Sequence, residues 1–451
     1  MFSRIVSVSR VLVVFISFSV VSMSGQQSPA PAASTQAPLT LTLQDALARA
    51  RSNSVQFQAA LTDRGVAHQD QVQARAGLLP SVAYNNQAIS TQNTAVASPA
   101  FIAANGSHEY VSQGNVHEGL TYSGYADYKR ARALEAVARA KAEIAGRGLV
   151  VTVVQGYYGL IAAQRKYANT QSAATEAQRF LGISQKLENG GEVAHADVIK
   201  AQIQSQDRQR DLREGQLAME KARLDLAVLL FPDFNENFTL VDDAQLAPPL
   251  VSFDEFSRAA QAKNPDLQAS TASLQAARYE VSSAWGGYLP ALAVDYFYGI
   301  DAPNFATHSV IADNAGNPVR INNLGSQASV TLNIPIWNWG ATHSKVVQAD
   351  LKRKQAQREL SLTQRKLQAD MRGLYAEAEA ARSELELLQS SAELAAESLR
   401  LTNLRYQGGE ATVLEVVDAQ NTLTQARNTF NDGEVRYRVA LANLQTLTGT
   451  M

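Results

Sequence analysis

Two segments in the second half of the chain alternate between apolar and polar side chains. Over 292–300 the even positions are apolar, whereas the odd positions include Asp295. Over 324–336 the even positions are again mostly apolar and the odd positions are mostly polar. Such alternation is typical of a β-strand with one apolar and one polar face, and the length fits a tilted membrane strand of about ten residues. The pattern therefore predicts strands over about 289–301 and 323–337.

A second, less regular pair of strands is predicted in the first half of the chain, over about 80–92 and 109–122. Polar loops near 93–108 and 301–322 join the two strands of each pair. A soluble two-layer sheet would alternate in the same way, so the alternation alone leaves that alternative open.

All three tryptophans favour a membrane. Trp285 precedes the third strand, and Trp337 and Trp339 end the fourth, so we expect them on the same side of the sheet. Aromatic side chains collect at membrane–water interfaces, and the polar loops would then face the outside of the cell. Four strands cannot close a barrel, because the smallest membrane barrels have about eight. Several chains must therefore contribute; three chains would supply twelve strands, although the strand count does not fix the number at three.

The last helix of each half carries large apolar side chains at seven-residue spacing. In the second half these are Val416, Leu423, Phe430, Tyr437 and Leu444, with small partners at Ala419, Ala426, Gly433 and Ala440. In the first half, large apolar side chains lie at multiples of seven residues at Val198, Leu212, Met219 and Leu226. Alternation of large and small residues at this period lets helices pack closely. Because the other faces are polar, the pattern alone favours a coiled coil over the wall of a water-filled tube.

The two halves are copies of one unit. Gly190-Gly191-Glu192 recurs as Gly408-Gly409-Glu410, and ordered matches continue on both sides. We assign 39–230 to one repeat, 251–448 to a second repeat and 231–250 to a linker. Each repeat is expected to contain a helical segment, two strands, a very long helix and a last helix. The helical parts are predicted over 42–78, 124–189 and 192–230, and over 253–287, 340–407 and 410–447.

The N-terminus is typical of an export signal. Arg4 and Arg10 precede a short apolar run that ends in small residues. We expect a signal peptide over 1–24 and a flexible leader over 25–38; a short N-terminal anchor is the alternative. No later apolar stretch approaches 18 residues, so we expect any membrane-embedded part to be a β-barrel.

The composition of the chain excludes several kinds of partner and chemical site. The net charge of −2 gives no indication of a nucleic-acid partner. The chain has no cysteine, which excludes disulfides and thiol-based metal sites. Its 6 histidines lack metal-ligand spacing, and no phosphate-binding loop or nucleophile elbow is present in the sequence. We therefore expect no cofactor, no metal and no catalytic residues, and we do not expect an enzyme.

Several motifs occur together with the duplicated unit. They are Leu79-Pro80 and Leu289-Pro290 before the first and third strands, Ile334-Pro335-Ile336-Trp337-Asn338-Trp339-Gly340 before the second long helix, and the two glycine pairs. With these motifs, essentially the whole mature chain closely resembles the TolC-like outer-membrane efflux protein family.

The resemblance implies a mixed α and β membrane protein. In the family, a homotrimer forms a twelve-strand outer-membrane β-barrel, surrounded by outer-membrane lipid, which continues into the periplasm as a barrel of twelve helices. The helical part is then a tube, and not the solid coiled coil that the pattern alone favours. The implied partners are a periplasmic adaptor (membrane fusion) protein and an inner-membrane pump. The implied function is that of a passive conduit in a tripartite efflux or type I secretion system.

The resemblance also assigns roles to the turns between the long and last helices. In the family, turns like those at Gly190, Gly191, Gly408 and Gly409 close the periplasmic entrance and meet the adaptor. The residues themselves indicate that Gly191 and Gly409 supply the positive φ needed to turn one helix back into the next. His195, beside the first turn, is expected to be a solvated polar residue and not a ligand.

Glu415 and Asp418 match family positions that form acidic rings at the pore constriction. Three copies would bring six carboxylates together, which would favour cations and raise the pKa of some of these groups. A solvated helix face is the alternative. Asp197 and Tyr406 match positions that tie neighbouring tip hairpins together in the closed state. Where the family can place an arginine in the closing network this chain has Ala411, so we expect closure by hydrogen bonds and packing.

Two other classes of protein fit parts of the pattern. A structural coiled-coil envelope protein without transport would share the heptads and the export signal, but it would not need lipid-facing strands. An exported soluble enzyme would share the export signal, but the sequence offers no catalytic cluster for it.

Overall fold

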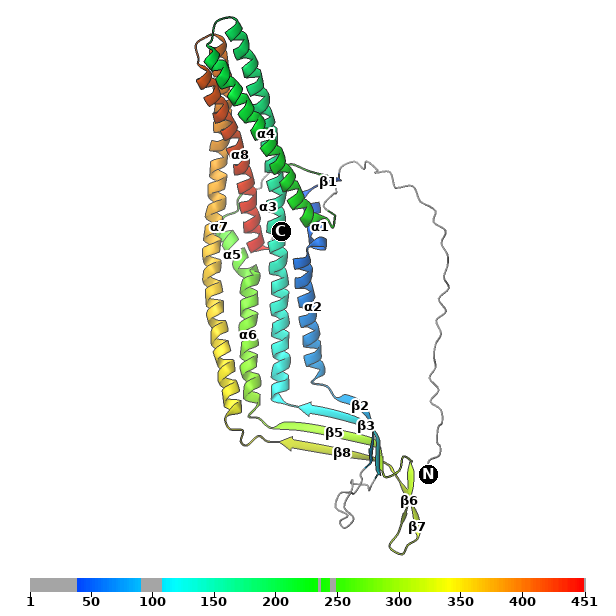
Figure 1. Cartoon of the computed structure of the whole chain (residues 1–451). Helices are drawn as coiled ribbons and strands as arrows, with labels where there is room; N and C mark the ends of the chain where they lie inside the picture. The colour runs from blue at the N-terminus through cyan, green and yellow to red at the C-terminus, as the bar shows by residue number, and fades with distance from the viewer. Residues whose placement is uncertain (1–38, 91–107, 234–236, 244–248, 450–451) are drawn as a thin grey trace, which may run out of the picture. The chain divides into compact units, whose positions relative to one another are not determined.

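The computed structural model describes residues 39–90, 108–233, 237–243 and 249–449 (Figure 1). The expected signal peptide and leader, and almost all of the loop near 93–108, lie outside these residues. Residues 40–451 form a unit of their own, and the fold described here is that of its described part.

Two successive sets of elements follow the same order along the chain (Figure 1). The first set contains α1 (Leu43–Asn53), α2 (Val55–Ala76), β2 (Ser81–Ser90), β3 (His108–Leu120), α3 (Tyr122–Asn189) and α4 (His195–Leu230). The second set contains α5 (Phe253–Lys263), α6 (Pro265–Gly286), β5 (Ala291–Ala302), β8 (Leu324–Asn333), α7 (Ala341–Gln407) and α8 (Val413–Thr448). The bounds of the long helices α3 and α7 agree closely with the ranges that the sequence predicts.

The first helical segment of each set is two helices, where the sequence predicted one. Ser54 separates α1 from α2, and Asn264 separates α5 from α6; both have extended ψ values, of 110° and 121°. Each side chain caps the second helix by accepting a hydrogen bond from the backbone N–H three residues later. Pro265 also disfavours helical geometry at Asn264, because the proline ring restricts the preceding residue.

Strands β2, β3, β5 and β8 form one antiparallel sheet in that order. The register places the even-numbered residues of all four strands on one face, with Val116 opposite both Val82 and Tyr296. The odd-numbered residues lie on the other face, where His117 Nδ1 and Asp295 Oδ1 are 2.7 Å apart. One face is therefore mostly apolar and the other mostly polar. Strands β2 and β8 are the edges of this sheet.

The expected polar loop near 301–322 contains a second hairpin, which the sequence pattern did not predict. Its strands are β6 (His308–Ala312) and β7 (Pro318–Asn322). Asp313 begins the turn by accepting hydrogen bonds from the backbone N–H groups of Ala315 and Asn317, both at 2.8 Å. Gly316 supplies a φ of 84°. The hairpin therefore depends on local turn chemistry and not on apolar alternation.

The segment predicted only as a linker, 231–250, contains a strand and part of the core. Strand β4 (Phe238–Leu240) pairs with β1 (Leu39–Leu41). The hydroxyl of Tyr157 in α3 donates to the carbonyl oxygens of Leu41 and Val241, at 3.2 and 2.7 Å. Phe231 and Phe238 are buried in the same cluster as Tyr157. The connection between the two sets is therefore packed against α3.

One of the described helices, α3, contains an 18-residue window that is apolar enough, by length and composition, to cross a membrane; 39% of the window is buried. The expectation that no such segment follows the export signal is therefore wrong. Packing accounts for much of the apolar character of α3, because Val153, Val154 and Tyr157 lie in a core shared with α1 and α4.

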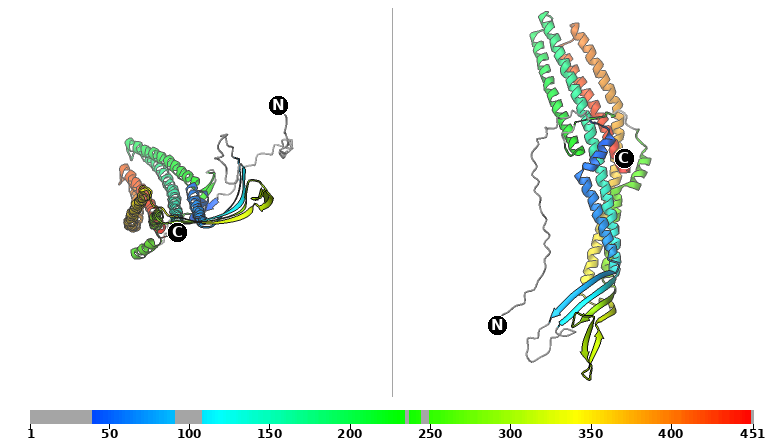
Figure 2. Two further views of the ribbon diagram at one scale, coloured as in Figure 1. Left: turned by 90° about the horizontal axis from the view of Figure 1, so that it is seen from below. Right: turned by 90° about the vertical axis from the view of Figure 1, so that its right-hand side faces the viewer.

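The long helices form two antiparallel hairpins, α3–α4 and α7–α8, which lie side by side (Figure 2). The heptad seam of α8 is in the interior: Val416, Tyr437 and Leu444 are buried. A Cβ on Gly433 would lie 2.7 Å from Leu388 Cδ1 of α7. The small residue at this heptad position therefore permits the close approach of α7 and α8, as the large-and-small pattern predicts.

Candidate functional site at the helical tips

Both tip turns use a left-handed glycine after the long helix. Gly191 has a φ of 77°, and its N–H donates to Glu188 O at 2.9 Å. The N–H of Glu192 donates to Leu187 O, also at 2.9 Å. This pair of bonds defines a helix end that requires a left-handed residue, for which glycine carries no Cβ penalty.

The second turn has the same geometry. Gly409 also has a φ of 77°, its N–H donates to Tyr406 O at 3.1 Å, and Glu410 N–H donates to Arg405 O at 2.8 Å. The positive φ predicted for the second glycine of each pair is thus present at both tips. The first glycines, Gly190 and Gly408, have φ values of −78° and −85°, so their backbone does not require glycine.

The second tip is fixed further by a capping box at the start of α8. Thr412 Oγ1 accepts a hydrogen bond from Glu415 N–H at 3.3 Å, and Glu415 Oε1 accepts from Thr412 N–H and Oγ1, both at 3.1 Å. Such a reciprocal pair satisfies two backbone donors at the helix N-terminus. The first tip has Ala194 at the equivalent position, without a side-chain cap.

Arg405 is a tip residue that the sequence reading missed. From the last turn of α7 its Nη2 donates to Glu410 O at 3.1 Å, and its Nη1 lies 3.4 Å from Glu415 Oε2. The position of the family's closing arginine holds Ala411 here, and Arg405 instead joins the two ends of its own turn. The turn could have indicated this residue, because a helix end of this kind brings its sixth residue, Glu410, back to its first, Arg405.

Within the single chain, the capping box shifts the pKa of Glu415. Hydrogen bonds from the N–H and then the hydroxyl of Thr412, followed by the charge of Arg405, lower the pKa of the Glu415 carboxyl. The rise in pKa expected from crowding of carboxylates concerns the constriction of three chains and stays a prediction. Within one chain the capping hydrogen bonds favour the charged form. Asp418 is exposed on α8, next to buried Ala419.

Asp197 and Tyr406 have separate partners in the described residues. Asp197, in the first turn of α4, lies with Oδ1 3.5 Å from Lys200 Nζ of the same helix. Tyr406 is 4% exposed, and its hydroxyl lies 3.0 Å from Ser184 Oγ of α3. Its ring packs against Phe180, with centroids 5.0 Å apart. Tyr406 therefore joins the α7–α8 hairpin to the α3–α4 hairpin within one chain.

His195 is exposed, as expected, but it has a partner across the first turn. Its Nδ1 lies 2.6 Å from Glu188 Oε1. Among the residues that the structure describes, no group of three or more histidine and acidic side chains is placed to hold a metal ion. The tips are therefore sites of ion pairing and helix reversal, and they display charged side chains beside the turns.

Comparisons with known proteins agree with this fold. A family described as "Outer membrane efflux protein" matches residues 257–450. The proteases secretion protein PrtF of Dickeya chrysanthemi is 23% identical over 421 residues, covering 91% of this chain and 88% of PrtF. TolC of Vibrio cholerae is 22% identical over 307 residues, 68% of each chain.

Solved structures extend the likeness over most of the chain. The CmeC outer membrane channel of Campylobacter jejuni superposes with a TM-score of 0.77 at 18% identity, covering 90% of this chain and 85% of CmeC. The outer membrane protein VceC of Vibrio cholerae superposes with a TM-score of 0.76 at 15% identity, covering 90% of this chain and 96% of VceC. The second half of the chain thus matches the outer membrane efflux protein family, and the relatives and solved structures extend the similarity over most of the chain.

These similarities support an outer-membrane location and a role as a channel for efflux or secretion. The family is one of transport conduits and not of enzymes. The three tryptophans lie where α6 and α7 adjoin the sheet: Trp285 near the end of α6, and Trp337 and Trp339 between β8 and α7. All three are exposed, and the rings of Trp337 and Trp339 are 5.8 Å apart.

An ion-pair cluster around Arg165, which the sequence reading also missed, ties the two sets of elements together. Arg165 of α3 donates to both carboxylate oxygens of Asp242, at 2.7 and 2.8 Å. It also pairs with Glu434 of α8, which is 6% exposed. Burial opposes the charge on Arg165, but the bonds to Asp242 and the charge of Glu434 outweigh this and raise the arginine's pKa. The cluster joins residues 269 positions apart, which no local pattern predicts.

Proposed function

We propose that this chain is the outer-membrane channel subunit of a tripartite efflux or type I secretion system, and that it works as a homotrimer. The sheet carries the proposal. Its four strands have an apolar even face and a polar odd face, and its edges β2 and β8 are free to pair with other copies. Membrane strands need closure, because an unpaired edge in lipid is costly. Three copies would give a twelve-strand barrel with the apolar face toward lipid.

The helices support the same assembly. Helix α2 has no buried residue in the single chain. On α7, Leu387, Leu394 and Leu401 are spaced by seven and are 69%, 68% and 46% exposed. An apolar heptad stripe calls for a helical partner. In the proposed trimer, helices of a second copy cover these surfaces, and the helical hairpins continue the barrel as a twelve-helix tube.

The proposed partners are a periplasmic adaptor protein and an inner-membrane pump. The relatives PrtF and AprF are named as protease secretion proteins, and the solved structure of CmeC is that of an outer membrane channel. These names support export of a substrate, from the periplasm or from a pump, as the role of this chain. The adaptor would meet the tips, where Gly191 and Gly409 reverse the helices. The structural coiled-coil alternative gives no reason for a sheet with one apolar and one polar face.

Native mass spectrometry of the detergent-solubilised protein tests the proposal. We expect a species of three chains. A monomer that is stable in solution without detergent would contradict both the barrel and the trimer. Conductance in planar lipid bilayers separates a channel from a structural envelope protein, which would insert no pore.

A further inference from the structure

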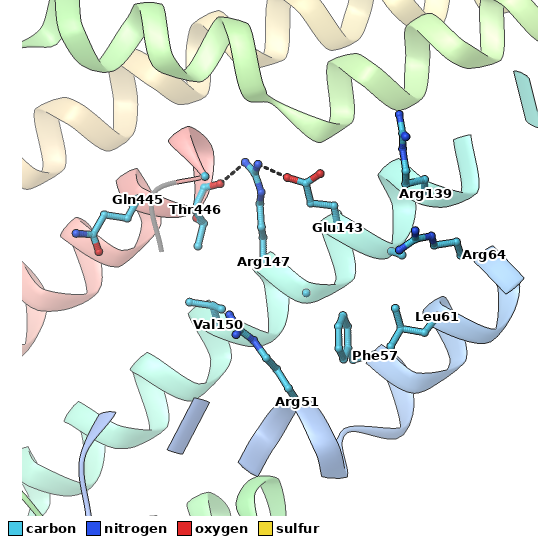
Figure 3. A pocket seen from close by; sticks show the side chains of 13 residues that line it. Arg51, Phe57, Leu61, Arg64, Arg139, Glu143, Arg147, Val150, Gln445 and Thr446 are labelled. Carbon is cyan, nitrogen blue, oxygen red and sulfur yellow. Dashed lines mark hydrogen bonds and ion pairs between the residues drawn. The ribbon is translucent and has the colours of Figure 1, made fainter. Parts of the chain in front are cut away.

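A basic pocket lies where α1, α2 and α3 meet the C-terminal end of α8 (Figure 3). It has a volume of about 400 Å³. Four arginines line it, Arg51, Arg64, Arg139 and Arg147, and the one acidic lining residue is Glu143. The lining therefore has a net charge of +3, in a chain whose net charge is −2.

Arg147 has a structural role. Its Nη1 donates to the carbonyl oxygens of Thr446 and Leu447, at 2.6 and 3.2 Å, and its Nη2 donates to Lys263 O at 3.0 Å. It also pairs with Glu143, as Figure 3 shows. These bonds satisfy carbonyl groups at the end of α8, and the ion pair neutralises Glu143, the one acidic residue of the lining.

The other three arginines are not neutralised in the same way. Among the described residues, no carboxylate pairs with Arg51, Arg64 or Arg139, and all three are exposed. Positive charges gathered without counter-charges create a potential that attracts anions. Guanidinium groups also bind carboxylate and phosphate oxygens with two parallel hydrogen bonds.

The pocket has an apolar wall beside these charges. Phe57, Leu61 and Val150 contribute to its lining. A Cβ on Gly146 would lie 3.1 Å from Phe57 Cε2, so the missing side chain at Gly146 lets the phenyl ring lie against α3. A ligand with both an anionic group and an apolar body would use both parts of the pocket.

The second set of elements shows that helix packing does not need these charges. Helices α1 and α5 are both 11 residues long, and α2 and α6 are both 22. At the places of Arg51 and Arg64, the second set has Gln261 and Leu274. The same pair of helices forms with neutral side chains there, and Leu274 is 7% exposed whereas Arg64 is exposed, so these positive charges are particular to the first set.

We propose that this pocket binds a soluble organic anion. A carboxylate or phosphate group contacts Arg64, and the apolar body of the ligand contacts Phe57 on the same helix; Arg51 and Arg139 add positive charge to the lining. The site is separate from the helical tips. Phe57 and Arg64 belong to α2, which lies next to a second copy in the proposed trimer, so the proposal requires that the pocket between α2 and α3 stays open in that assembly.

Isothermal titration calorimetry on the purified protein in neutral detergent tests this proposal, with phenyl phosphate and inorganic phosphate as probes. We expect phenyl phosphate to bind more tightly than inorganic phosphate, with affinity falling as salt is raised. Arg64→Gln should weaken both by about tenfold, because it removes a charge-assisted hydrogen bond. Phe57→Leu should weaken phenyl phosphate alone. Arg132→Gln, an exposed cation elsewhere on α3, is the matched control and should change neither.

Absence of binding by the unaltered protein would overturn the proposal, as would an equal loss in the Arg132→Gln control. A lower trimer fraction for Arg64→Gln in native mass spectrometry, with no anion binding by the unaltered protein, would mean that a carboxylate of a neighbouring chain fills the pocket. Arg51→Gln provides a second variant if Arg64→Gln fails to fold.

Discussion

Gly191 and Gly409 determine the two tip turns through backbone conformation alone. A Cβ at either position would meet no heavy atom within 4 Å, so space is available for a side chain. The constraint is the φ of 77°, which costs an L-residue roughly 1–2 kcal/mol. The requirement for glycine is therefore local, which is why the repeated glycine pair in the sequence was sufficient to locate both turns.

Replacing Gly191 and Gly409 together by Val is expected to abolish export while leaving insertion into the outer membrane intact. A β-branched residue is strained in the left-handed region, so the turns should rearrange, and the strands lie at the opposite ends of the long helices. Export assays and outer-membrane fractionation measure the two effects. Gly190→Ala with Gly408→Ala is the control, because these φ values are negative. Export that survives the Val double variant would argue against docking at the tips.

The lowered pKa of Glu415 determines how the second tip responds to pH. Hydrogen bonds from Thr412 favour the carboxylate form, so their contribution to stability is present above the ordinary glutamate pKa. This contribution is lost as the pH falls through the lowered folded-state value. At neutral pH the group is therefore charged, as a cation-selective ring requires.

Changing both Glu415 and Asp418 to Ala is expected to reduce cation selectivity and weaken block by multivalent cations. The reason is the loss of six carboxylates from the proposed constriction of three chains. Trimer assembly should not change, because the buried seam is formed by neighbours such as Val416. Single-channel recordings measure the effect, with Glu393→Ala on α7 as control. Unchanged selectivity in the double variant would place these carboxylates outside the pore.

At the scale of elements, the cluster of Arg165, Asp242 and Glu434 holds α3, the connection between the sets and α8 together. Its counterpart on the surface is Arg436 of α8, whose Nε and Nη1 lie 2.6 and 2.7 Å from Glu377 and Glu384 of α7. The two clusters have similar charges but different burial, so their contributions to stability should differ.

Arg165→Met is expected to lower the free energy of unfolding by about 3 kcal/mol, because it leaves the buried Glu434 carboxylate without its partner. Thermal or denaturant unfolding of the helical part measures the loss. Arg436→Gln breaks exposed ion pairs between α8 and α7, and it should lower the free energy of unfolding much less. Adding Glu434→Gln to Arg165→Met should recover part of the loss. Equal destabilisation by Arg165→Met and Arg436→Gln would show that burial does not decide how much an ion-pair cluster contributes to stability.

At the scale of the whole molecule, the single chain leaves surfaces that another copy can cover. These are the sheet edges at β2 and β8 and the apolar stripe at Leu387, Leu394 and Leu401 of α7. Strand pairing and helix packing would act together, because β2 follows α2 and β8 precedes α7. In the proposed trimer, the edge strand and the edge helix on each side of a chain would therefore meet the neighbouring chain together.

Leu394→Asp is expected to reduce the fraction of trimer, because it places a charge in the proposed helix–helix seam. Leu394→Met, which keeps the position apolar, should leave the trimer intact. Native mass spectrometry of both variants in detergent provides the measurement. Cysteine cross-linking can follow the same interface, since the chain has no cysteine of its own. A full yield of trimer from Leu394→Asp would mean that this stripe faces solvent in the assembly.

The sequence by itself determined the features that depend on periodicity or local backbone geometry. Alternation over 292–300 fixed the two faces of β5, and seven-residue spacing fixed the seam that includes Val416. The repeated glycine pair located the turns, because a left-handed φ at Gly191 and Gly409 is a property of a few adjacent residues. None of these requires knowledge of which distant residues meet.

Only the tertiary structure decided the contacts between residues far apart along the chain. Arg165 meets Glu434 because α3 and α8 pack together, and Arg51 and Arg147 line one pocket because α1 lies against α3. The pairing of β1 with β4 likewise depends on the two strands meeting beside Tyr157. A side-chain pattern records the burial of each residue, but the identity of its partner follows from helix packing and strand pairing, which bring distant segments within bonding distance.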